Sequence, residues 1–351
     1  MLQRYAYLNT GTFGPLPRAT VEAMQAVERR ELDEGRSSHA YFEQVMEQRE
    51  LLRGEHAALL STPPEQVALT SSTTEGCNIV LGGLRIQPGD EVVTTDSEHP
   101  GLMGGLVASG AKLRIAEVAE LAAADVLAAV QEQVTPQTRL IALSHVSWIT
   151  GIVLPVGELT GNGVPVLVDG AQGAGAIPVD VQALGVDFYT VSAQKWLLGP
   201  ASTGALYVAA DRVEECRVAC PSYFSWKLPD YELRETAGRF EGSWTPPASV
   251  AGLLASFAFA REAGEGRYAR AREMAERCRA LLLEHGAEVV TEPGQATLVT
   301  WRGEETGEIV ERLAGQGVIV RDLPGLGLLR ASCGFWTSDD DLERLVTGLS
   351  T

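Results

Sequence analysis

The sequence lacks the features of several protein classes. No apolar run approaches the roughly 18 residues of a membrane-spanning helix, and the polar opening Met1–Tyr5 does not resemble a signal peptide. Basic stretches are also missing, because 28 Lys and Arg face 46 Asp and Glu and the formal net charge is −18. This balance argues against nucleic acid and anionic membranes as partners. We therefore expect a soluble protein of the cytoplasm with no membrane partner.

Cysteine is scarce, with 5 in 351 residues. The irregular spacing fits a reducing compartment and not a disulfide framework. Cys216 and Cys220 lie four residues apart, but no second ligand pair accompanies them, so we predict no metal site. A nicotinamide-binding fingerprint is incomplete as well. The run 173–178 lacks the third glycine and ends on Pro178, a poor residue for the helix that must come next.

Composition and patterning predict an α/β fold. Hydrophobic residues make up 45% and charged residues 21%, and a chain of this length suggests one large and one smaller domain. Up to about residue 210, apolar runs alternate with helical patterns, which predicts a mostly parallel, doubly wound central sheet. The strand at 204–208 comes too soon after its predecessor for a crossover helix, so we expect it to pair antiparallel.

The part beyond residue 240 has a different pattern. We predict a long helical region over 248–285, short strands such as 287–290, and a closing helix over 339–349, which together indicate a small α+β domain. We place the large domain at 15–240 and the smaller one at 1–14 and 241–351. The Gly- and Pro-rich opening loop either covers an active site or forms a mobile terminus.

Two apolar runs lead to opposite charges. The run 164–168 ends on Asp169, and the run that begins at Val186 leads to Lys195. Because parallel strands end at the same edge of a sheet, we expect the two side chains to lie close together. A lysine there can form a Schiff base, and an aspartate can keep a pyridinium nitrogen protonated. The pair therefore indicates a pyridoxal phosphate (PLP) site, although either residue alone would be ordinary.

Two loops at the same edge carry further candidates. Ser, Thr and Gly dominate 71–76, between a predicted strand and a helix expected to open at Cys77. Free backbone N–H groups and hydroxyls at a helix N-terminus can bind a phosphate, although helix capping alone explains such residues equally well. His99 comes after the predicted strand 90–95. Its ring could stack on a planar cofactor or face solvent.

With these motifs in order, the sequence resembles the class V aminotransferases, a group of fold-type I PLP enzymes that includes cysteine desulfurases and isopenicillin N epimerase-like proteins. The resemblance spans nearly the whole chain and implies a fold-type I PLP-transferase fold. It is carried by seven motifs in the family's order: Ser72–Gly76, Glu98-His99, Ser144–Ser147, Val168–Gly173, Ser192–Trp196, Phe240–Pro246 and Arg330–Ser332.

The resemblance implies catalytic roles for three residues. Lys195 would bind PLP as a Schiff base and, once displaced by the substrate's amino group, would remove the α-proton. Asp169 would pair with the pyridine nitrogen, and His99 would stack on the ring. Gln172 would bind the phenolic oxygen of the ring.

The resemblance also implies binding roles. Further contacts to the cofactor, chiefly to its phosphate, are implied for Thr73, Thr74, Ser147, Ser192 and Gln194. The substrate would be bound by Asn9, Trp148 and Arg330, with the arginine forming a bidentate fork on a carboxylate. A threonine in the position of Thr245 reaches a neighbouring subunit's phosphate, which implies a homodimer with shared sites.

Departures from the family pattern bear on the reaction. Cysteine desulfurases carry a catalytic cysteine shortly before the arginine, but residues 317–329 contain none and Cys333 lies beyond Arg330. Trp148 stands where the family often has asparagine, and Gln194 stands where many relatives have histidine. These features favour the epimerase-like and cysteine-lyase-like branch.

We therefore expect a PLP enzyme that acts on the α-carbon of an amino acid, with transamination as the first expectation. A cysteine or cystine C–S lyase, or an amino-acid epimerase, is the alternative on the same scaffold. A protein that keeps PLP without turnover is the non-enzyme alternative, and intact Lys195, Asp169 and Arg330 argue against it. A dehydrogenase is the remaining enzyme alternative.

Overall fold

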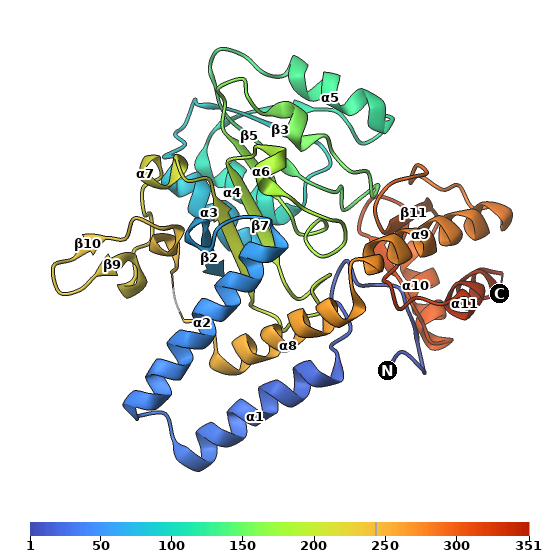
Figure 1. Cartoon of the computed structure of the whole chain (residues 1–351). Coiled ribbons are helices and arrows are strands. Elements are labelled where there is room, and N and C mark those ends of the chain that lie inside the picture. Colours follow the sequence, from blue (N-terminus) through green and yellow to red (C-terminus); the bar gives the residue numbers. More distant parts are fainter. Residues whose placement is uncertain (243, 351) are drawn as a thin grey trace.

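A largely parallel sheet of seven strands forms the centre of this computed structural model, which describes residues 1–242 and 244–350 (Figure 1). The strand order is β2-β8-β7-β6-β5-β3-β4, with bounds β2 (Val67–Thr70), β3 (Glu91–Thr95), β4 (Lys112–Ala116), β5 (Thr138–Ser144), β6 (Val166–Asp169), β7 (Phe188–Ser192) and β8 (Gly204–Val208). β8 runs antiparallel to both neighbours, as expected, and the other pairs are parallel. Ser243 of the predicted motif 240–246 lies outside the described residues.

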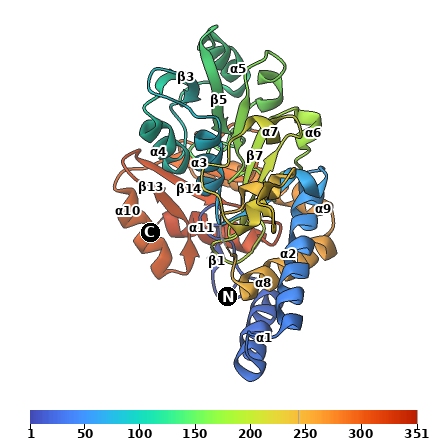
Figure 2. The ribbon, with the colours of Figure 1, turned by 90° about the vertical axis from the view of Figure 1, so that its left-hand side faces the viewer.

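Helices cover both faces of this sheet, which confirms the doubly wound α/β prediction. Their bounds are α1 (Arg18–Glu34), α2 (His39–Leu59), α3 (Thr73–Gly83), α4 (Pro100–Ser109), α5 (Ala123–Glu132), α6 (Val181–Leu184), α7 (Arg212–Glu215) and α8 (Pro247–Ala263). Along β5, Leu140 and Ala142 point to the face covered by α3 and α4. Ile141 and Leu143 point to the opposite face, which α2, α5, α6 and α8 cover. α1 and α2 both lie against α8 (Figure 2).

A second group of elements comes after α8. It contains α9 (Gly266–Glu284), α10 (Thr306–Gly315), α11 (Asp339–Leu349), the antiparallel sheet β11 (Leu298–Arg302), β14 (Leu328–Ser332) and β13 (Arg321–Leu323), and the parallel pair β1 (Ala6–Tyr7) and β12 (Val318–Ile319). Its own apolar core joins the N-terminal residues Ala6 and Leu8 to α9 and α11. α8 instead packs on the central sheet. The domain boundary near residue 240 stays a prediction.

The structure corrects three local predictions. The helical region 248–285 is two helices, because Gly264 has φ +72° and ends α8. The predicted strand at 287–290 is reduced to one bridge between Val289 and Trp301. α3 begins at Thr73 and not at Cys77, since the Ser72 hydroxyl accepts a hydrogen bond from the Glu75 N–H at 3.1 Å. Within the described chain, every helix is too short or too polar to cross a membrane.

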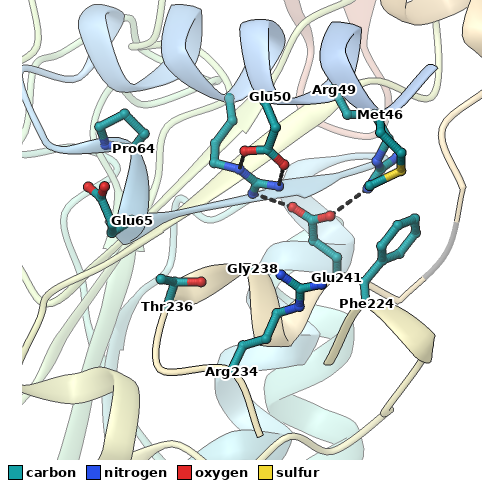
Figure 3. A pocket seen from close by; sticks show the side chains of 11 residues that line it. Met46, Arg49, Glu50, Pro64, Glu65, Phe224, Arg234, Thr236, Gly238 and Glu241 are labelled. Carbon is teal, nitrogen blue, oxygen red and sulfur yellow. Dashed lines mark hydrogen bonds and ion pairs between the residues drawn. The ribbon is translucent and has the colours of Figure 1, made fainter. Parts of the chain in front are cut away.

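A buried carboxylate fastens the segment that precedes α8. Glu241 is 1% exposed and accepts a hydrogen bond from the Leu69 N–H of β2 at 2.9 Å. It also accepts hydrogen bonds from Arg49 and Arg53 of α2 (Figure 3). The Arg49 guanidinium is equally buried and lies 4.1 Å from the centre of the Phe224 ring. Glu241 therefore ties the chain leading to Thr245 to one helix and one strand of the large unit.

Replacement of this carboxylate should destabilise the fold. Glu241→Ala leaves the Arg49 charge buried without its partner, so the free energy of unfolding should fall by about 3–5 kcal/mol. Glu50→Ala is the matched control, because Glu50 also pairs with Arg53 but its side chain is 62% exposed; it should change stability by no more than about 0.5 kcal/mol. Urea denaturation at fixed protein concentration measures both variants, and equal losses would contradict the anchoring role.

Candidate active site

A cavity of about 190 Å³ opens at the carboxyl edge of the central sheet. Residues from the N-terminal loop, from the start of α3, from several strand ends and from the second sheet meet there. The lining residues are Gly11, Thr12, Phe13, Ser72, Thr73, Thr74, His99, Trp148, Gln172, Ser192, Gln194, Lys195, Arg321 and Arg330. Most of the residues expected from the sequence are thus brought together.

A larger cavity of about 270 Å³ lies beside α2 and is lined by charges that neutralise one another (Figure 3). Glu241 pairs with Arg49 and Arg53, and Glu50 pairs with Arg53. Among the described residues, no lysine, histidine or cysteine lines it. The chemistry of the side chains therefore places the candidate active site in the smaller cavity.

Lys195 and Asp169 form the charged centre of the site. Asp169 is the last residue of β6, and Lys195 lies just beyond the end of the neighbouring strand β7. Burial lowers the pKa of the Lys195 ammonium to about 8, an effect that the nearby Asp169 carboxylate opposes. Burial also raises the pKa of Asp169, while Lys195 and the Ala171 N–H, 2.9 Å from Oδ1, lower it. Each group thus helps to keep the other ionised.

His99 is held as a neutral ring on the cavity wall. Its Nδ1 accepts a hydrogen bond from the Gly101 N–H at 3.0 Å at the start of α4, so the ring proton sits on Nε2. Burial, together with the charges of Lys195, Arg321 and Arg330, lowers the pKa of His99 to about 4. The ring meets Trp148 edge to face, with centroids 5.2 Å apart.

The start of α3 faces the cavity. The Thr73 N–H donates to the Ser192 hydroxyl at 3.1 Å, which joins the helix start to the end of β7. Thr74, one residue on, is exposed toward the cavity. Free N–H groups in the first turn of an α-helix favour an anion such as phosphate. The earlier start of α3 places both threonines in that turn.

Arg330 is buried with donors to spare. It is 1% exposed, and its Nη1 donates to the Trp148 carbonyl at 2.7 Å, while Nε and Nη2 have no partner among the described residues. Burial, and the charge of Arg321, lower the pKa of Arg330 to about 9. Two free, desolvated donors on a guanidinium match a carboxylate of the substrate.

Sequence reasoning missed Arg321. This residue is the direct cross-strand partner of Arg330 in β13 and β14, and both side chains line the cavity. The Nη1 of Arg321 donates to the Thr12 hydroxyl at 3.1 Å. Since opposed residues of an antiparallel pair share a face, the strand pairing 321–323 with 328–330 would have revealed it.

The N-terminal loop covers the cavity, which decides between the two alternatives for this segment. The Gly11 carbonyl accepts a hydrogen bond from Gln172 Nε2 at 2.8 Å, and the Gly14 N–H donates to the Gln194 carbonyl at 2.7 Å. A Cβ on Gly14 would lie 2.1 Å from the Lys195 carbonyl oxygen, so only glycine allows this approach. Gln172 is held further by Trp196, whose Nε1 donates to Oε1 at 2.8 Å.

Four candidate residues lie outside the cavity lining. Asp169 is buried behind it, close to Lys195. The Ser147 hydroxyl accepts hydrogen bonds from the N–H groups of residues 149 and 150 and so holds the turn that bears Trp148. Asn9 accepts a hydrogen bond from the Thr12 hydroxyl at 2.8 Å, and Thr245 is buried elsewhere. The binding roles of Ser147, Asn9 and Thr245 stay predictions.

These groups fit PLP. The half-buried Lys195 can bind its aldehyde carbon, the buried Asp169 carboxylate can pair with its ring nitrogen, and Thr74 in the first turn of α3 can bind its phosphate. Gln194 also carries a buried Oε1 with no partner among the described residues. The free donors of Arg330 suit an anionic ligand, whereas the Gln194 oxygen can only accept a hydrogen bond from a donor of the ligand.

Comparison with known sequences identifies the family of the chain. The model of the family described as aminotransferase class-V matches residues 6–345. Isopenicillin N epimerase of Streptomyces clavuligerus is 30% identical over 394 residues, covering 97% of this chain and 93% of the epimerase. A probable cysteine desulfurase of Methanothermobacter thermautotrophicus is 28% identical over 277 residues, covering 75% of this chain and 68% of the relative.

Solved structures show the same likeness. The cystine C–S lyase C-DES, in complex with its reaction product cysteine persulfide, is 31% identical with a TM-score of 0.93, covering 99% of this chain and 98% of that one. A lysine-to-alanine variant of C-DES with glycine covalently linked to the PLP cofactor is 32% identical with a TM-score of 0.92, covering 99% and 97%. The chain belongs to the class V aminotransferase family of PLP-dependent enzymes.

Proposed function

We propose that this PLP enzyme is a C–S lyase that cleaves the Cβ–S bond of cystine or a similar β-thio amino acid. The observation that supports it most is a cavity with two arginines on one face and no cysteine among its described lining residues. The likeness to a cystine C–S lyase and to an epimerase also supports these alternatives better than the transamination that we expected first.

Two arginines suit a substrate with two carboxylates. The unpartnered Nε and Nη2 of Arg330 are suited to the α-carboxylate next to the reacting carbon. Arg321, opposite on the neighbouring strand, adds a second positive charge beside Arg330, which a second carboxylate of the substrate would balance. Cystine has a distal carboxylate that could approach Arg321.

The lack of a thiol among the described lining residues separates this proposal from a desulfurase. Of the cysteines near the site in sequence, Cys333 is fully buried in the core of the second unit together with Cys278. Cys77 lies on the buried side of α3 against Thr190, where burial raises the pKa of its thiol well above the ordinary value. Neither thiol is placed to accept sulfur, so sulfur would leave as a small-molecule persulfide.

The residues of this chain would divide the chemistry among them. PLP, when bound, accepts the electrons of the α-carbon as its proton is removed. Lys195, with its lowered pKa, can take that α-proton, and Asp169 can keep a proton on the ring nitrogen. Cleavage sends the electron pair of the Cβ–S bond to sulfur. The loop around Gly11 and Gly14 excludes water during these steps.

An epimerase is the second candidate, because the Streptomyces relative covers nearly the whole chain. Both reactions begin with loss of the α-proton, and they differ in the next step. An epimerase returns a proton to the opposite face of the α-carbon and keeps every other bond of the substrate. Recovery of the inverted amino acid without sulfur release would favour this second candidate.

We also propose a homodimer in the cytoplasm. Thr245 is not among the described residues that line the cavity of its own chain, and it comes directly after Trp244, whose 39% exposed ring meets Phe42 and Tyr223. An exposed aromatic surface next to Thr245 supports a neighbouring subunit at this point. Gel filtration with light scattering tests this, and a monomer would contradict it.

The site of cofactor attachment can be mapped without ambiguity. The chain has three lysines, and the other two, Lys112 and Lys227, have side chains 62% and 48% exposed in ion pairs. Borohydride reduction of the PLP-loaded protein should fix the cofactor on Lys195 in a peptide map. Lys195→Ala should lose the modified peptide, whereas Lys227→Ala should keep it. Modification at Lys112 or Lys227 would contradict the assignment.

Attachment should depend on pH through Lys195. Only the neutral amine reacts with the aldehyde, and burial lowers the pKa of Lys195 from 10.5 to about 8. The rate of PLP uptake by the apoprotein should therefore rise about tenfold from pH 6 to pH 7 and level off above about pH 8. Stopped-flow absorbance measures this rate. A rate that still climbs about tenfold between pH 8.5 and 9.5 would contradict it.

The two arginines should affect substrates differently. Arg330→Lys loses the bidentate fork and should lower kcat/KM about 10–100-fold for both cystine and S-methylcysteine. Arg321→Gln should lower kcat/KM for cystine at least about tenfold more than for S-methylcysteine, since the latter has no distal carboxylate. Arg302→Gln, on the outer strand β11, is the control. Equal losses on both substrates in Arg321→Gln would contradict the distal role.

A further inference from the structure

Glu98 is a buried carboxyl next to the active site with no role in the proposed lyase chemistry. It lies just beyond β3 and is 7% exposed. Its Oε1 accepts a hydrogen bond from the Thr95 hydroxyl at 2.7 Å, and its Oε2 accepts one from the Ser144 hydroxyl at 2.6 Å. Because Thr95 ends β3 and Ser144 ends β5, the carboxyl joins the ends of two neighbouring strands.

The same carboxyl lies near the charged centre of the site. Ser144 is the cross-strand partner of Asp169, so Glu98, Ser144 and Asp169 succeed one another along the carboxyl edge. Burial, opposed by the bonds from Ser144 and Thr95, raises the pKa of Glu98 to about 7, and the charge of Asp169 contributes to the rise. Two carboxylates buried along the same edge of the sheet resist simultaneous ionisation.

Two titratable groups next to Glu98, Cys77 and His99, keep a constant charge near neutral pH. Cys77 of α3 stays a neutral thiol, because burial raises its pKa well above the ordinary value. His99, the next residue, stays neutral because its pKa is about 4. Lys195 lies on the far side of Asp169, at the end of β7. Glu98 is therefore suited to change its charge near neutral pH.

We propose that Glu98 is a positioning residue that acts on PLP through the charge of the neighbouring Asp169, and that its change of charge controls how tightly the ring nitrogen keeps its proton. The inference rests on the role proposed for Asp169 and is independent of the reaction branch. Neutral Glu98 donates its own proton to one of the two hydroxyls. Ionised Glu98 accepts from both and adds a negative charge behind Asp169, which favours a protonated nitrogen.

Glu98→Gln tests this, because the amide keeps the shape but cannot ionise. Infrared difference spectra between about pH 5.5 and 8.5 should show the carbonyl band of a protonated carboxyl that fades as pH rises and is missing in Glu98→Gln. The pH midpoint of the absorbance change of the PLP-loaded protein should shift by about one unit in this variant. Glu117→Gln, an exposed acid just after β4, should leave both signals unchanged.

Three results would overturn the inference. One is the absence of the carbonyl band at every pH, since Glu98 would then be always ionised. Another is the expected band in the unaltered protein together with an unchanged absorbance midpoint in Glu98→Gln. The carboxyl would then titrate without acting on the cofactor. If Glu98→Gln does not fold, Ser144→Ala serves in its place. It removes one hydrogen-bond donor to the ionised carboxylate, so the band of the protonated carboxyl should persist to higher pH. A band that fades at the wild-type pH in Ser144→Ala is the third.

Asp169→Asn separates this inference from its premise. Loss of the Asp169 charge should let Glu98 ionise at lower pH, so the carbonyl band should fade earlier. An earlier fade together with an unchanged absorbance midpoint would mean that Asp169 does not act on the ring nitrogen. The inference would then fail through the role of Asp169 and not through the coupling of the two carboxyls.

Discussion

An ammonium and a carboxylate removed from water at neighbouring strand ends can stay ionised only by virtue of each other and of the groups around them. Lys195, half-buried on the cavity wall, and Asp169, buried behind it, are largely in this position at the carboxyl edge of the central sheet. The parallel order of β6 and β7 brings them together, and the start of α3 supplies a positive helix end beside them. The fold thus concentrates buried charge at the one edge where a charged cofactor can balance it.

The cover of this edge comes from distant parts of the chain. The N-terminal loop reaches Gln172 and Gln194 through hydrogen bonds of its backbone, and the second sheet contributes Arg321 and Arg330. The loop spans the two units, because Leu8 packs in the core of the second unit while Gly14 lies against Lys195 of the first. Substrate recognition therefore depends on how the second unit sits against the central sheet.

Much of this arrangement could be predicted because strand ends are encoded locally. Apolar β-branched runs that stop at a charged residue marked Lys195 and Asp169, and the alternation of strands and helices predicted the doubly wound sheet. Arg321 was missed because its place in the cavity depends on the pairing of β13 with β14, which one strand alone does not reveal. The cofactor contact expected of Ser147 stays a prediction, because its hydroxyl accepts two hydrogen bonds within its own turn and its proton is not engaged there. Gly264 ends α8. The residues on both sides of it keep a helical period, so the pattern predicted one helix although the glycine marked a break.

The cleavage of a C–S bond at this site is tested most directly by the products formed from L-cystine by the PLP-loaded enzyme. We expect pyruvate, ammonia and cysteine persulfide in equal amounts, with no net change in the cofactor. Alanine formed from L-cysteine in a parallel assay, with its sulfur passed to an added thiol as a persulfide, would indicate a desulfurase. Conversion of PLP to pyridoxamine phosphate with a keto acid would indicate transamination. Either result, or D-configured cystine as the main product, would contradict the lyase assignment.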